Sequence, residues 1–68
     1  MIRSLVLDNK PYTVQSAIDK LHGIPRPGQR VRIARGHLAD GRQYRLYLCN
    51  VSNRLGFELI THSEAQND

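Results

Sequence analysis

One short stretch with helical periodicity constrains this fold more than any other feature of the chain. Its apolar positions are Val14, Ala17, Ile18 and Leu21. Their spacing of i, i+3, i+4 and i+7 places all of them on one face of a helix. Thr13 suits the N-cap, Gly23 suits the left-handed residue that ends a helix, and Pro25 prevents continuation. We therefore predict a helix from about Val14 to His22, which needs a sheet to pack on because it is so short.

Most of the remaining chain alternates apolar and polar residues between turn signals, which is typical of strands. We expect strands at residues 2–7, 29–34, 42–49 and 57–61, with a short return strand near Tyr12. Asp40-Gly41 is a strong hairpin signal, and residues 50–56 are expected to form a loop. This order predicts an α+β fold: a small two-layer domain with one short helix packed on a three- to four-stranded, mainly antiparallel sheet.

The chain has 68 residues, which is enough for one domain with a small core. We assign residues 1–61 to a single α+β domain and expect residues 62–68 to form a polar, flexible tail. The apolar run at the N-terminus is too short for a signal peptide, and no stretch approaches the ~20 apolar residues of a membrane span. We therefore expect a cytoplasmic protein without membrane contact.

The sequence contains no motif that indicates catalysis. Cys49 is the single cysteine, so no intrachain disulfide can form, and no Cys/His group has the spacing of zinc ligands. The three histidines are scattered singly, and no phosphate-binding loop, dinucleotide fingerprint or paired carboxylates are present. We predict a non-enzymatic protein with no catalytic residues, no metal site and no small-molecule cofactor.

Charge is distributed unevenly along the chain. Residues 26–54 carry seven arginines against Asp40 alone, whereas residues 55–68 contain only acidic charges. Strand alternation places part of this block on one face of the sheet, away from the side that the helix covers. The residues predicted on this open face are Arg30, Arg32, Arg45 and Tyr47, and those expected to widen it from flanking segments are Arg26, Arg35 and Arg54. The residues predicted beneath the helix are Val31, Ile33, Leu46, Leu48, Phe57 and Leu59.

An exposed sheet face with guanidinium groups beside an aromatic ring favours nucleic-acid binding. Guanidinium groups match phosphate geometry, and both arginine and tyrosine can stack on unpaired bases. The alternative is a small protein-binding inhibitor or adaptor, of the type that phages and mobile elements encode, that docks on a larger nucleic-acid-handling machine. Tyrosine and arginine are enriched in protein interfaces as well, and outward Ile60 favours this alternative. A homodimer is compatible with both, and a purely solubilising role for the arginines is the third interpretation.

Overall fold

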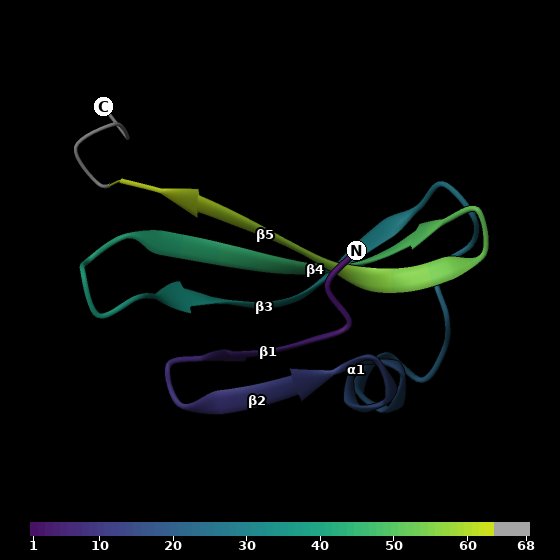
Figure 1. Cartoon of the computed structure of the whole chain (residues 1–68), viewed down its shortest axis with the longest axis horizontal. Coiled ribbons are helices and arrows are strands. Elements are labelled where there is room, and N and C mark those ends of the chain that lie inside the picture. Colours follow the sequence, from purple (N-terminus) through teal and green to yellow (C-terminus); the bar gives the residue numbers. More distant parts are fainter. Residues whose placement is uncertain (64–68) are drawn as a thin grey trace.

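The computed structural model describes residues 1–63 and contains one helix and two antiparallel sheets. The elements, in order, are β1 (Ser4–Leu7), β2 (Lys10–Thr13), α1 (Val14–Leu21), β3 (Arg30–His37), β4 (Gln43–Val51) and β5 (Arg54–His62). β1 and β2 form a hairpin, and the other strands form a sheet in the order β3-β4-β5. The hairpin and α1 lie on one side of this larger sheet (Figure 1). The predicted α+β class and element order are confirmed, although β1 and β2 form a sheet of their own.

The helix begins where the sequence predicted. The Ser16 backbone N–H donates to the Thr13 hydroxyl at 3.1 Å, and the Thr13 N–H donates to the Ser16 hydroxyl at 3.0 Å. This reciprocal capping satisfies two backbone groups that a helix start leaves unpaired. The helix ends at Leu21, one residue before the predicted end at His22. The residue in the left-handed conformation is His22, with φ 57°, and not Gly23.

Two tight turns join neighbouring strands, and the second makes β4 and β5 longer than the sequence predicted. Asp8 and Asn9 join β1 to β2, and Ser52 and Asn53 join β4 to β5, all four with positive φ. Turns of this kind match the right-handed twist of the strands that they connect. The loop expected at residues 50–56 is therefore wrong, since pairing continues to the rung Val51–Arg54. The predicted tail, residues 62–68, lies outside the described residues from 64 onward, and His62 is the last residue of β5.

An irregularity in β3 explains why this strand continues past its predicted end at Ala34. Arg32 lies opposite Tyr47, but Ala34 lies opposite Leu46, so Ile33 is an extra residue in the ladder. Such a bulge lets both Ile33 and Ala34 face the core and reverses the alternation that follows. Arg35 therefore lies within β3 and points to the same face as Arg32.

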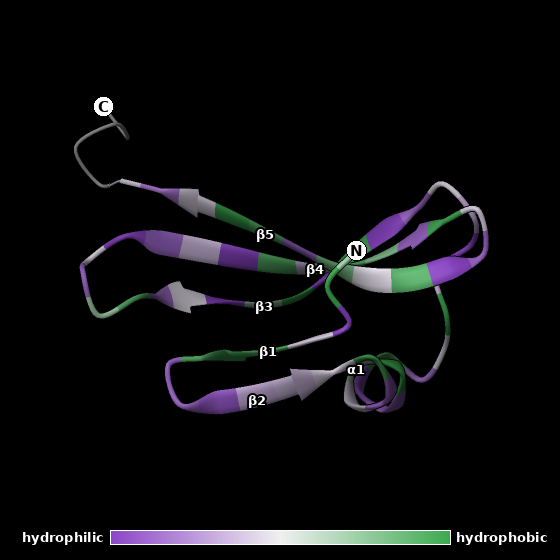
Figure 2. Cartoon of the chain, viewed as in Figure 1, coloured by the Kyte–Doolittle hydropathy of each residue, from purple (hydrophilic) through white to green (hydrophobic). Residues whose placement is uncertain are grey.

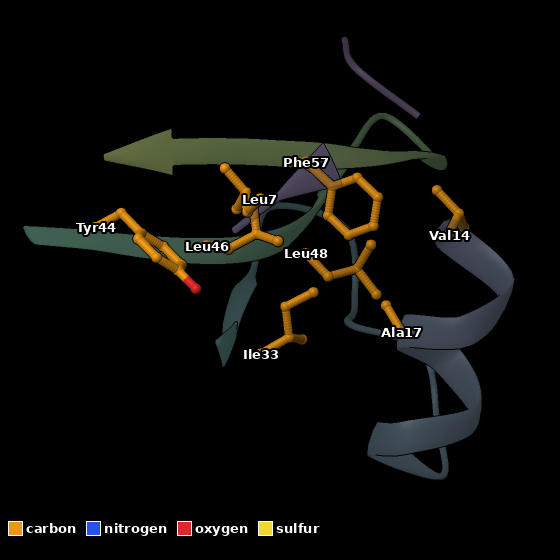
Figure 3. Close-up of a cluster of buried hydrophobic side chains, with 8 residues drawn as sticks. All are labelled: Leu7, Val14, Ala17, Ile33, Tyr44, Leu46, Leu48 and Phe57. Carbon is orange, nitrogen blue, oxygen red and sulfur yellow. The ribbon is translucent and has the colours of Figure 1, made fainter. Parts of the chain in front are cut away.

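The core lies between the larger sheet on one side and α1 with the β1–β2 hairpin on the other. Figure 3 shows its buried side chains, which are Leu7, Val14, Ala17, Ile33, Tyr44, Leu46, Leu48 and Phe57. Ile18 and Leu21 pack against this cluster, so the helical stripe faces the sheet as predicted. Val31 and Leu59 were predicted beneath the helix, but they are 38% and 36% exposed because they lie on the two outer strands. Figure 2 shows hydrophilic residues at the start of β4 and hydrophobic residues further along it.

Two further contacts hold the chain segments that flank the sheet. Ile2 pairs with Phe57 in an isolated bridge, which ties the N-terminus to β5. The buried Asn50 side chain donates to the Pro25 carbonyl at 2.8 Å, and its backbone N–H donates to the Gln29 carbonyl at 3.0 Å. These bonds fasten the connector between α1 and β3 to β4. Within the described part of the chain, no helix has the length and apolar character needed to cross a membrane.

Candidate nucleic-acid interface

The outer face of the larger sheet carries most of the predicted site residues. Directly opposite residues of an antiparallel pair point to the same side of the sheet. Arg32 lies opposite Tyr47, and Arg35 lies opposite Arg45. Arg30, two residues before Arg32 in the same strand, shares their orientation. We call this outer surface the arginine face, with the residues Arg30, Arg32, Arg35, Arg45 and Tyr47.

β5 completes the arginine face with residues of a different character. Glu58 lies opposite Tyr47, Ile60 lies opposite Arg45, and His62 lies opposite Gln43. A carboxylate therefore lies beside Tyr47, and a half-buried aliphatic side chain lies beside Arg45. The predicted outward orientation of Ile60 agrees with this register, and Glu58 shares that orientation.

At one end of the arginine face, the side chains already bind one another. The Arg30 Nη1 lies 2.6 Å from the Glu58 Oε1, and the Arg30 guanidinium carbon lies 4.6 Å from the centroid of the Tyr47 ring. Because Arg30 stacks on Tyr47, the ring face that sequence analysis proposed for base stacking is covered. The ion pair also cancels the charge of Arg30. This end of the face is therefore close to neutral.

The other end of the arginine face keeps its positive charge. Among residues 1–63, no carboxylate forms an ion pair with Arg32, Arg35 or Arg45. Arg35 and Arg45 line a shallow cavity of about 360 Å³, to which His37 and His62 also contribute. Among residues 1–63, no acidic side chain lines this cavity. The arrangement is suited to an anion, because guanidinium groups donate paired hydrogen bonds to phosphate or carboxylate oxygens.

The two other predicted site residues lie apart from this charged end. Arg54 begins β5 and by alternation belongs to the outer face, but it lies at the turn after β4, beyond the Arg30–Glu58 pair. Arg26 lies in the connector and lines a groove with Leu21 and Ile24, so the structure does not bring it to the arginine face. Arg35, by contrast, was expected in a flanking segment and lies in the centre of the charged end.

Sequence analysis missed two lysines that approach the same region. Lys10 begins β2 and Lys20 lies in the last turn of α1, and both line a second cavity together with Arg32 and Arg35. No local pattern in the sequence signals this proximity, because it depends on how the hairpin and helix pack against β3.

The thiol of Cys49 is not arranged for nucleophilic chemistry. It is 6% exposed, and burial raises its pKa, with the negative charge of Glu58 acting in the same direction. A thiol with a raised pKa is a poor nucleophile at neutral pH. Within residues 1–63, no three His, Cys, Asp or Glu side chains come close enough together to hold a metal ion.

Comparisons with known proteins found no match: no protein-family model, no curated protein sequence and no solved structure is similar enough to this chain.

Proposed function

We propose that this protein binds nucleic acid through the arginine face and that single strands bind more tightly than duplexes. The observation that carries the proposal is the charged end of the face. There Arg35 and Arg45 share one rung and Arg32 lies two rungs away, with spacings on the order of 5–7 Å and without a carboxylate partner among the described residues. Cations gathered in this way release counterions when they bind phosphates, which drives association.

The Arg30–Tyr47 stack supports the preference for single strands. The Arg30 side chain is 52% exposed, so the guanidinium plane turned away from Tyr47 is accessible. Guanidinium planes stack on unpaired bases, whose faces are hidden in a duplex. In this proposal the phosphates lie over the charged end, and a base stacks on Arg30 at the neutral end.

The direct test is fluorescence anisotropy with labelled single- and double-stranded DNA and RNA at two salt concentrations. We expect binding of single strands that weakens steeply with salt, with a slope of about 0.7 for each phosphate contacted. Replacing Arg45 with Gln should weaken binding roughly threefold to tenfold. The salt slope should fall by about 0.7, which corresponds to the loss of one phosphate contact.

The matched control is Arg3→Gln, which removes the same charge near the opposite edge of the sheet, next to the Ile2–Phe57 bridge. If Arg3→Gln and Arg45→Gln weaken binding equally, only net charge matters and the arginine face is not the site. If the wild-type protein does not bind any oligonucleotide at low salt, the proposal is wrong.

The second candidate is docking on another protein, and the observation that favours it is the mixed character of the face. Ile60 lies opposite Arg45, and Glu58, which pairs with Arg30, lies two rungs away on the same face. Interfaces of this kind combine an apolar contact with arginine and tyrosine. Ile60→Ser separates the two candidates, since it should leave oligonucleotide affinity within about twofold and weaken a protein complex roughly tenfold.

A further inference from the structure

A second basic cavity lies around the edge of β3 from the arginine face. It has a volume of about 370 Å³ and lies between the β1–β2 hairpin, the end of α1 and the open edge of β3. Its charged residues are Lys10, Lys20, Arg32 and Arg35, and its aromatic residues are Tyr12 and Tyr44. We call it the edge cavity. At ~30 Å³ per water molecule, it has room for a phosphate group and several waters.

The edge cavity gathers four cations, and no acidic residue of the described part of the chain lines it. Asp40 and Glu58 form ion pairs with other arginines, and Asp19 accepts a hydrogen bond from Gln15. Asp8 is near enough to Tyr44 to contribute to its raised pKa, but it does not line the cavity. The clustered positive charges repel one another, and a bound anion would relieve that repulsion.

The bulge in β3 holds one of these cations in place. The Lys20 ammonium donates to the Ile33 carbonyl at 2.8 Å, and Ile33 is the extra residue in the ladder. An ammonium group has three donors, so two are available for another acceptor. The main-chain bond orders the lysine in advance, which lowers the entropic cost of binding an anion.

Arg35 connects the edge cavity with the arginine face. Arg35 lines both the edge cavity and the shallow cavity beside Arg45. Arg32 lines the edge cavity and is also part of the arginine face. Positive charge therefore continues around the edge of β3 without interruption by a carboxylate of the described residues.

From this continuity we infer that the edge cavity binds one phosphate of the nucleic-acid strand that lies on the arginine face, so that the strand crosses the edge of β3. This inference rests on the proposed function. It assigns the phosphate to Lys10, Lys20 and Arg35, with Lys20 held by the bulge.

The test compares Lys10→Gln and Lys20→Gln with Arg3→Gln as the charge-matched control, using a labelled single-stranded oligonucleotide. Each lysine variant should bind roughly threefold to tenfold more weakly than wild type, with a salt slope lower by about 0.7. Lys20→Arg should retain most of the affinity. Lys10→Gln is the control for a folding defect, since Lys10 has no hydrogen bond comparable to that of Lys20 with the Ile33 carbonyl. Thermal unfolding midpoints equal to that of wild type show that each variant is folded.

A second measurement separates this inference from the proposed function. Inorganic phosphate is titrated into ¹⁵N-labelled protein, and saturable shifts at the amides of Lys20, Ile33 and Arg35 are expected. If Arg45→Gln weakens oligonucleotide binding but both lysine variants bind like wild type, the edge cavity is not a phosphate site and the proposed function stands. If phosphate shifts these amides but no oligonucleotide binds, the cavity takes a free phosphate and the assignment to a strand is overturned.

Discussion

Arg35 and Arg45 lie directly opposite each other on β3 and β4, and no carboxylate of residues 1–63 pairs with either. Like charges in this position destabilise a sheet by about 0.2–1 kcal/mol, and salt screens the effect. The pair is therefore a small local cost to folding that a bound anion would remove.

The cost of this pair predicts a gain in stability when one charge is removed. Arg45→Gln should unfold at a higher urea concentration than wild type at low salt, and the difference should shrink at high salt. The measurement is urea unfolding at two ionic strengths. A variant that is less stable than wild type at low salt would show that Arg45 makes a stabilising contact that outweighs the repulsion.

The Arg30–Glu58 ion pair predicts that Glu58 restrains nucleic-acid binding. Glu58→Gln removes the negative charge beside Tyr47 at the neutral end of the arginine face and releases Arg30 for a phosphate. We expect binding to tighten roughly threefold to tenfold and the salt slope to increase by about 0.7. Stability should change by no more than about 1 kcal/mol, because both side chains are exposed. Unchanged or weaker oligonucleotide binding in anisotropy would show that Arg30 does not contact the strand.

Burial raises the pKa of Tyr44 above its usual value of 10.0, and the nearby charge and hydroxyl of Tyr12 act in the same direction. The folded state therefore holds the phenol proton more tightly than the unfolded state does. The stabilisation is complete below pH 10 and is lost as the pH rises through the raised pKa of Tyr44. Tyr44→Phe should lose less stability than wild type between pH 9 and 11 in urea unfolding. Parallel curves for the two proteins would contradict this prediction.

Gly36 lies opposite Tyr44, and a Cβ at this position would come within 3.0 Å of the tyrosine ring and hydroxyl. Tyr44 is 5% exposed and has little room to move. We expect Gly36→Ala to lower the free energy of unfolding by about 1–3 kcal/mol. Gly23→Ala is the control, since a Cβ there meets nothing within 4 Å, and it should be neutral or slightly stabilising. Equal stability of the two variants would mean that the Tyr44 ring shifts at no cost.

The reciprocal bonds between Thr13 and Ser16 predict a loss of about 0.5–2 kcal/mol in Thr13→Ala, because a backbone N–H of α1 loses its acceptor. Thr13→Ser keeps the hydroxyl and should retain most of the stability. The stability of both variants is measured by thermal unfolding followed by circular dichroism. If Thr13→Ser is as unstable as Thr13→Ala, the loss of stability comes from the missing methyl group and not from the missing hydroxyl.

The sequence by itself determined the local elements and the orientation of most of their side chains. Thr13 and the apolar stripe after it specify the helix, because capping and periodicity act within a few residues. Alternation placed Arg30, Arg32, Arg45 and Tyr47 on one face for the same reason. The strand ends were less predictable, since the turn at Ser52-Asn53 lets pairing continue through residues that look like loop formers.

Only the tertiary structure decided which part of the arginine face carries charge. Glu58 neutralises Arg30 because the β4–β5 register places it beside Tyr47, and this register depends on contacts between strands. The bulge at Ile33 turned Arg35 onto the face, and packing of α1 against the sheet brought Lys20 to the bulge. These contacts join residues that are distant in the chain, and no local propensity encodes them.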